Sequence, residues 1–209
     1  VSLWFKPDST ITTSSSSQVL LILSLDSYGW GFAVAIGSVT VHVANELILV
    51  NTTNGGAYRR SAYTASGGTV SAAWHHLLVN FNTDVYDIWL DGTKVSNATQ
   101  GGAQAVMNAS NVTAGSRAGT NNFYAGLLDE VAIWDTAALS DAEIAAVYNS
   151  GEPTDLTVNA GDYTSASDLV GFWRMGDNDG GSGTTVTDQG SGSNNMTLQN
   201  GAAIVEDAP

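Results

Sequence analysis

The amino-acid sequence predicts an all-β sandwich with one peripheral helix, and three observations support this fold class. Short apolar runs with a two-residue alternation recur along the chain, separated by segments rich in Gly, Ser, Thr and Asn. The chain has 209 residues, which suits one large β-domain or one domain with a short appendage. Hydrophobic residues make up 43% of the chain, so a sizeable core can form.

Alternating apolar patterns predict the strands in chain order. The clearest strands span residues 1–5, 18–25, 29–36, 39–44, 46–51, 74–82, 85–92 and 124–135. The stretch FNTDVYDIWLDGTKV, residues 81–95, predicts a hairpin whose turn lies near Asn82 to Asp84. The Asp91-Gly92 pair predicts a second turn into a short third strand.

One helix is predicted near residues 140–149, within LSDAEIAAVYNSG. Ser140 and Glu143 have the spacing of a capping box, in which each side chain binds the backbone N–H of the other residue. Gly151 is expected to end the helix, because glycine adopts the left-handed conformation that helix ends require.

Charge is distributed unevenly along the chain. Residues 1–128 hold six acidic and five basic residues, whereas residues 129–209 hold fourteen acidic residues and one base, Arg174. The formal net charge of −14 therefore lies almost wholly in the C-terminal part. Such a surface repels phosphates and anionic headgroups, so neither nucleic acid nor a membrane is expected as a partner. Hard cations are favoured instead.

The polar residues indicate where the protein works. Only 12% of residues are charged, so Ser, Thr, Asn and Gly must make up most of the surface, a balance common in extracellular and virion proteins. There is no cysteine, which excludes disulfides, catalytic thiols and thiolate metal sites. No stretch approaches the roughly 20 apolar residues of a membrane span. We therefore expect an extracellular or virion-surface location.

A tryptophan between carboxylates suggests a sugar-binding patch. In the strand at 85–92 the alternation places Trp89 and Asp87 on the face opposite the core residues. His76 and Asn80 lie on the matching face of the preceding strand and could join them. Sugar sites combine an aromatic plate with polar groups that bind hydroxyls. The alternative is that a loop or the helix covers Trp89.

Two stretches together resemble a known family. WHHLLVNFN followed by VYDIWLDGTKV, and then FYAGLLDEVAIWDTAALSDAEIAAVYNSG, resemble laminin G-like modules of the concanavalin A-like lectin/glucanase superfamily. The resemblance covers residues 1–151 and implies a jelly-roll sandwich of two antiparallel sheets. Members of this superfamily include glycan-binding modules, adhesion modules and some glycoside hydrolases.

The tail, residues 168–209, resembles the segment that normally begins such a module. It opens with DLVGFWRMGD, whose two faces are both largely apolar. The tail follows a predicted linker, residues 152–167, and it also resembles virion structural proteins of tailed phages of marine bacteria. Three arrangements remain open: the tail closes its own sandwich, begins a second module, or pairs with a neighbouring subunit.

The distribution of glutamates argues against catalysis. Sandwich glycosidases of the resembling superfamily commonly carry a Glu pair on one strand, whereas the five Glu here are scattered. We therefore expect a non-catalytic structural or adhesive module, a virion or filament subunit that contacts copies of itself or other subunits. It could also bind cell-surface glycans. The alternative function is a free secreted carbohydrate-binding module.

A calcium site is predicted at Asp129. This residue lies in phase with Leu127, Val131 and Ile133, so a regular strand would turn its carboxylate inward, where an unpaired charge is costly. In the resembling sandwiches the equivalent Asp often holds a structural Ca²⁺ together with an acidic turn. The resemblance therefore implies the following ligands from the tail: Asp177, Asp179 and Asp188. The alternative is that Asp129 accepts backbone N–H bonds without an ion.

Overall fold

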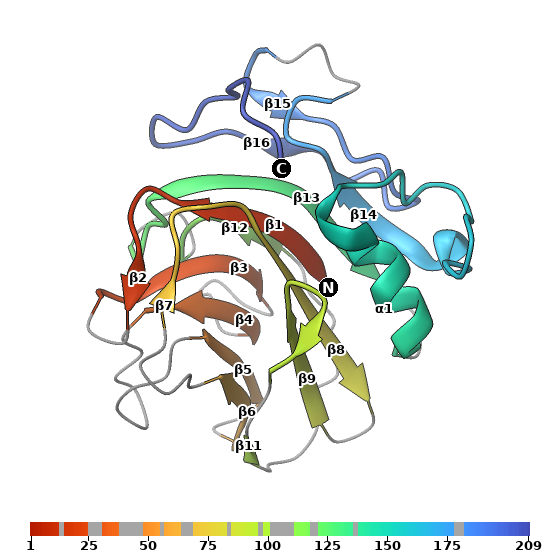
Figure 1. Ribbon diagram of the computed structural model, residues 1–209. Helices are drawn as coiled ribbons and strands as arrows, with labels where there is room; N and C mark the ends of the chain where they lie inside the picture. Colours follow the sequence, from red (N-terminus) through yellow and green to blue (C-terminus); the bar gives the residue numbers. More distant parts are fainter. Residues whose placement is uncertain are drawn as a thin grey trace.

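The computed structural model describes residues 1–12, 15–24, 31–37, 48–54, 57–63, 69–82, 85–95, 98–100, 111–117, 121–135, 138–177 and 182–209. Among these residues two antiparallel six-stranded sheets face each other, as the all-β prediction requires (Figure 1). The strand predicted at residues 39–44 lies outside the described residues. No described helix is long and apolar enough to cross a membrane.

The first sheet joins segments from both ends of the chain. Its strands, in spatial order, are β10 (Thr93–Lys94), β9 (Val85–Leu90), β8 (His75–Asn82), β1 (Ser2–Pro7), β13 (Gly126–Trp134) and β14 (Leu169–Trp173). The predicted hairpin is confirmed, because β8 and β9 pair antiparallel. Asp91 and Gly92 both have positive φ angles in the turn that leads to β10.

The second sheet lies across the core. Its strands, in spatial order, are β11 (Ala98–Gln100), β6 (Ala57–Tyr63), β5 (Ile48–Asn54), β4 (Gly31–Ile36), β3 (Gln18–Ser24) and β12 (Asn111–Ala114). The remaining described strands form two small two-stranded antiparallel sheets: β2 (Ile11–Thr12) with β7 (Thr69–Val70), and β15 (Thr185–Val186) with β16 (Met196–Thr197). The core between the sheets contains Leu3, Phe5, Leu77, Tyr86, Ile88, Leu21, Val34 and Trp173.

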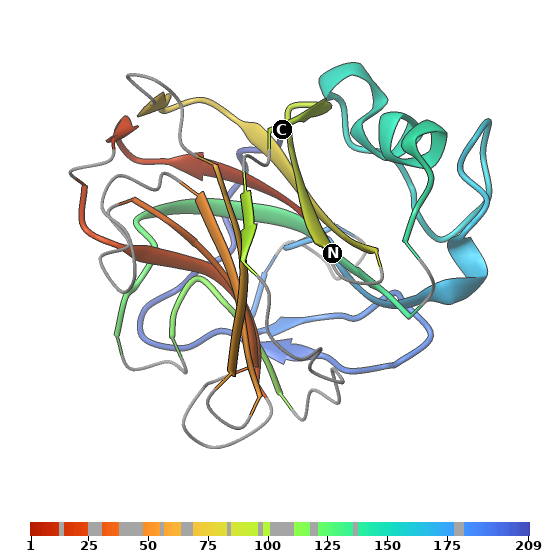
Figure 2. The ribbon, with the colours of Figure 1, turned by 90° about the horizontal axis from the view of Figure 1, so that it is seen from below.

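Helix α1 (Asp141–Tyr148) lies on the outer face of the first sheet (Figure 2). The capping box is confirmed, since Ser140 and Glu143 each bind the other's backbone N–H. The α-helix ends at Asn149, which has a φ of 46°, two residues before the predicted Gly151. Gly151 instead ends the 3₁₀ turn η1 (Asn149–Gly151). A second apolar cluster holds the helix against the sheet through Ile144, Val147, Leu139, Leu78 and Ala132.

The tail strand β14 pairs antiparallel with β13 of the same chain. Of the three arrangements left open by the sequence, the structure therefore has the tail closing its own sandwich. Trp173 reaches the core between the sheets, whereas Phe172 packs beneath the helix. Burying side chains of this size stabilises a fold by roughly 1.5–3 kcal/mol each.

Residues 152–167, predicted as a linker, are bound to the sandwich. Tyr163 accepts a hydrogen bond from Trp134 Nε1 at 2.9 Å and donates to the Leu156 carbonyl at 3.0 Å. Thr164 and Ser165 both donate to the Glu143 carboxylate before the 3₁₀ turn η2 (Ala166–Asp168) begins. The segment thus fixes the approach of β14 to the sheet edge.

Candidate functional site

The residues of the predicted glycan patch do share one face of the first sheet. Leu78 pairs with Trp89 and Asn80 with Asp87 across β8 and β9, so these side chains point the same way. That face, however, is covered by helix α1. Trp89 packs against the apolar cluster beneath the helix, as the alternative interpretation of the sequence had it.

His76 is the most deeply buried member of the predicted patch. Only 1% of it is exposed, and its Nε2 lies 2.7 Å from the Ser2 hydroxyl. Its ring lies close to Trp4 and stacks on Tyr148 at the end of the helix. Burial lowers the pKa of His76 to about 4, although nearby Asp91 partly opposes the shift. The prediction that His76 contacts a glycan is therefore wrong.

Asn80 and Asp87 are occupied by contacts within the protein. The Asn80 amide donates to the Leu139 carbonyl at 2.7 Å and accepts from the Leu139 N–H at 2.9 Å, which fixes the segment before the helix. Asp87 binds Lys94 at 2.6 Å on the neighbouring strand. The prediction of an open sugar-binding face here is wrong because α1 and its leading segment use that face.

A bulge in β13 changes the orientation of Asp129. Ser2 lies opposite Ala132 and Trp4 opposite Asp129, so two residues of β13 face one residue of β1 between these pairs. Glu130, within the bulge, has a φ of 49°. Asp129 therefore shares the outer face with Trp4, and the prediction that it points into the core is wrong.

Asp188, predicted as a calcium ligand, holds the tail together instead. Its Oδ1 accepts the backbone N–H groups of Phe172 and Gly190, each at 2.8 Å, and its Oδ2 accepts that of Asn194 at 2.7 Å. The following residues bind the outer edge of β14, where the Gln189 N–H donates to the Phe172 carbonyl at 2.8 Å. This loop covers an edge that would otherwise be open to another strand.

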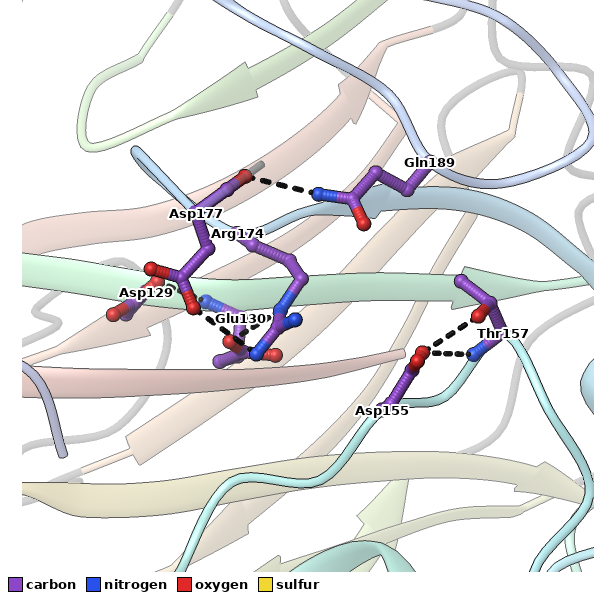
Figure 3. A network of polar contacts seen from close by, with 7 residues as sticks. All are labelled: Asp129, Glu130, Asp155, Thr157, Arg174, Asp177 and Gln189. Atoms are coloured by element: carbon purple, nitrogen blue, oxygen red, sulfur yellow. Dashed lines mark hydrogen bonds and ion pairs between the residues drawn. The ribbon is translucent and has the colours of Figure 1, made fainter. Parts of the chain in front are cut away.

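Arg174 lies at the centre of a group of carboxylates where β14 ends (Figure 3). Its Nε donates to Glu130 Oε1 at 2.9 Å, and its Nη2 lies 3.1 Å from Asp177 Oδ2. Asp129 lies beside them and accepts the Glu130 N–H at 2.8 Å. Glu130 is 5% exposed, and its Oε2 has no hydrogen-bond partner among the described residues.

Burial controls the protonation of these carboxylates. Burial raises the pKa of Asp129 to about 7; the Glu130 N–H opposes this shift, and the nearby Glu130 and Asp177 charges add to it. Burial also raises the pKa of Glu130, against the lowering effect of the Arg174 guanidinium. The Arg174 guanidinium pairs with Glu130 and Asp177, whereas Asp129 forms no ion pair among the described residues.

A pocket of about 450 Å³ opens above this group. Its floor comes from Asp129 and from the residues that follow β14, and the C-terminal residues form its other wall. Asp207 holds that wall in place, because its carboxylate binds Lys6 at 2.7 Å and the Trp74 indole N–H at 3.1 Å. The lining residues are Asp129, Arg174, Met175, Gly176, Asp177, Ile204, Val205, Glu206, Asp207 and Ala208.

The predicted calcium ligands are only partly brought together. Asp129 and Asp177 line the pocket, Asp188 binds the tail backbone, and Asp179 lies outside the described residues. Within the described ranges, no three His, Cys, Asp or Glu side chains are arranged to hold a metal ion. Calcium needs six to eight oxygen ligands, and the Arg174 guanidinium already lies beside Asp177. The described residues do not fit the predicted calcium site.

Sequence reasoning missed Arg174, Glu130 and the C-terminal wall. One signal was available, because Arg174 is the single base among residues 129–209. A lone base in so acidic a segment has to lie near carboxylates. Which carboxylates it binds depends on the pairing of β13 with β14, and that pairing was left open.

Comparison with known families gives the same fold class as the strand order. The profile described as the concanavalin A-like lectin/glucanases superfamily matches residues 1–145. The chain belongs to this superfamily. The match ends within helix α1, so β14 completes the superfamily sandwich from outside the matched region. A comparison with curated proteins found no match.

Solved structures support the same architecture for this superfamily member. A crystal structure described as "a putative carbohydrate binding protein from Bacteroides ovatus" is similar, with a TM-score of 0.59 and 12% sequence identity. The similarity covers 99% of this chain but 56% of that one, so this chain spans little more than half of the other protein. At this identity the similarity establishes the fold alone, and the tail is included in it.

Proposed function

We propose that the protein is a non-catalytic carbohydrate-binding module, and that the pocket between the end of β14 and the C-terminal wall is its sugar site. The observation that carries the proposal is the composition of this pocket. The C-terminal wall includes the apolar residues Ile204 and Val205, and the floor includes the acidic residues Asp129 and Asp177. A pyranose has one apolar face and a ring of hydroxyls, which such a pocket complements.

Size and family membership support this proposal. A volume of about 450 Å³ falls within the roughly 300–1,000 Å³ usual for small-ligand pockets. The superfamily is named for lectins and glucanases, and the similar structure is described as carbohydrate binding. The pocket replaces the patch around Trp89, which the helix covers.

Binding without hydrolysis is favoured by the state of the carboxylates. Glycosidases place two carboxyl groups on either side of the scissile bond. Glu143 is held by hydrogen bonds from Ser140, Thr164 and Ser165, and Glu130 is buried against Arg174. Neither of these glutamates lines the pocket, whose lining has Glu206 as its single glutamate and therefore no pair of glutamates.

The proposal is tested with a panel of monosaccharides and short oligosaccharides. Binding is measured by titration calorimetry, and release of reducing ends is measured in the same samples. We expect binding that weakens in Asp177→Asn, without release of reducing ends, whereas the exposed Asp162→Asn variant binds normally. Hydrolysis would overturn the non-catalytic role, and failure of every sugar to bind would overturn the function.

We further propose an extracellular or virion surface as the setting, as part of an adhesive or structural assembly. The support is compositional: 12% charged residues, no cysteine and a net charge of −14. Electron microscopy and sedimentation of the purified protein would test this. Regular assemblies are expected for a virion or filament subunit, and a monomer at all concentrations would favour a free binding module.

A further inference from the structure

The pocket carries more negative charge than its own cations can balance. Four carboxylates line it, from Asp129, Asp177, Glu206 and Asp207. Asp207 is bound to Lys6, and Asp177 shares the Arg174 guanidinium with Glu130. In the described part of the chain no lysine or arginine forms an ion pair with Asp129 or Glu206. The pocket therefore attracts a positively charged group.

Glu130 is buried beside the pocket and is not one of its lining residues. Its side chain is 5% exposed, and only Oε1 is bound by Arg174. Its Oε2 lacks a partner among the described residues. Figure 3 shows this carboxylate facing the guanidinium, beside the carboxylates of Asp177 and Asp129. Because Arg174 binds both Glu130 and Asp177, its single positive charge is shared, and this group of acids contributes a negative potential at the pocket that favours a cationic ligand.

The apolar lining residues indicate that the ligand also has an apolar face. The C-terminal wall includes the apolar residues Ile204, Val205 and Ala208, against which a ring can lie, and the floor includes Asp129 and Asp177. A bare metal ion would make no contact with these apolar side chains. A ring with one apolar face and a cationic substituent at its edge would contact both sides.

We propose that the pocket binds a sugar with a free, protonated amine, that is, a hexosamine that is not N-acetylated. This inference rests on the proposed carbohydrate-binding function and specifies its ligand class. The ammonium group lies against Asp129 and Asp177, and the apolar face of the pyranose lies against Ile204 and Val205. N-acetylation removes the charge and adds bulk where the ammonium group lies, so it opposes binding.

The experiment compares matched monosaccharides on the full-length protein. Glucosamine, galactosamine and mannosamine are each titrated beside the parent hexose and the N-acetylated form, with EDTA present to remove metal ions. At least one amine is expected to bind about tenfold or more tightly than its two matched forms. Methylammonium, which has the charge without the ring, is expected to bind more weakly than the amino sugar.

Two variants locate the effect. Asp177→Asn removes a 64% exposed carboxylate, so it keeps the fold and should weaken amine binding about two- to fivefold. Asp129→Asn, in the more enclosed position, should weaken it about tenfold or more. Asp162→Asn removes the same charge from an exposed turn outside the pocket lining and should leave binding unchanged.

The outcomes separate this inference from the proposed function. If neutral and N-acetylated sugars bind as tightly as the amines, the amine inference is wrong and the carbohydrate function stands. If no sugar binds, both fail. An equal loss of binding in Asp162→Asn would show non-specific attraction to an acidic protein, and methylammonium binding as tightly as the amino sugar would remove the sugar from the assignment. Tight calcium binding that depends on Asp129 would make the pocket a metal site instead.

Discussion

Arg174 Nε and Glu130 Oε1 lie 2.9 Å apart, although 44 positions separate the two residues in the chain. The contact joins the tail strand to the bulge of β13. It is partly buried, since the exposed side-chain fractions are 18% for Arg174 and 5% for Glu130. Arg174 also lines the pocket, so the pairing of the tail strand with β13 both closes the sandwich and builds the site.

Replacing Arg174 tests the energetic weight of this contact. Arg174→Met should lower the free energy of unfolding by about 3–5 kcal/mol, because it leaves the buried Glu130 charge without its partner. The double variant Arg174→Met with Glu130→Gln should recover part of this loss. Lys94→Met, which breaks the more exposed pair with Asp87, should cost about 0–1 kcal/mol. Urea denaturation measures all three, and equal losses for the two single variants would contradict the account.

Trp89 should behave as a packing residue beneath the helix. Trp89→Ala should destabilise the protein by about 3 kcal/mol, because it removes a large side chain from the cluster that holds α1. Trp89→Phe should cost much less, since the indole N–H has no partner among the described residues. Thermal melting compares the two variants. A Trp89→Ala protein as stable as the original, but unable to bind sugar, would restore the patch predicted from the sequence.

The pH dependence of stability should include a contribution from His76. Its pKa is about 4 in the folded protein because of burial, against about 6.5 when unfolded, so the unfolded chain binds more protons between these values. Stability should therefore fall as the pH is lowered from about 6.5 to 4, by about 1.4 kcal/mol per pH unit. Urea denaturation at several pH values checks this. His76→Gln should show a shallower slope across this range, and an unchanged slope would exclude the contribution.

Calcium provides a separate test of the site. Asp188 is bound to backbone N–H groups and Asp177 lies beside Arg174, so neither carboxylate is free to hold calcium as the sequence predicted. Melting temperatures in excess EDTA and in millimolar calcium should therefore agree. A rise in calcium that is lost in Asp129→Asn would contradict this expectation and restore the predicted calcium site, because ligand binding to the folded state stabilises it.

Local sequence signals predicted much of the fold. The capping box of Ser140 and Glu143, the Asp91-Gly92 turn and the apolar tail strand each depend on neighbouring residues, and the structure confirms each of them. The face of Trp89 was also predicted correctly, because alternation along a regular strand sets it.

The candidate site was predicted poorly because it depends on contacts between distant segments. One inserted residue at the Glu130 bulge reverses the orientation of Asp129, and alternation cannot reveal a bulge. Whether helix α1 covers Trp89 depends on the path of the chain after β13. The C-terminal wall of the pocket depends on Asp207 binding Lys6 and Trp74, which lie far away in the sequence.

The central claim is that a sugar binds where the tail completes the sandwich. The most direct test is to record ¹⁵N–¹H spectra of the full-length protein while an amino sugar is added. We expect shifts concentrated in residues 129–130, 174–177 and 204–208, which line the pocket or contact its lining residues. Shifts concentrated instead on β8 and β9, around Asp87 and Trp89, would contradict it.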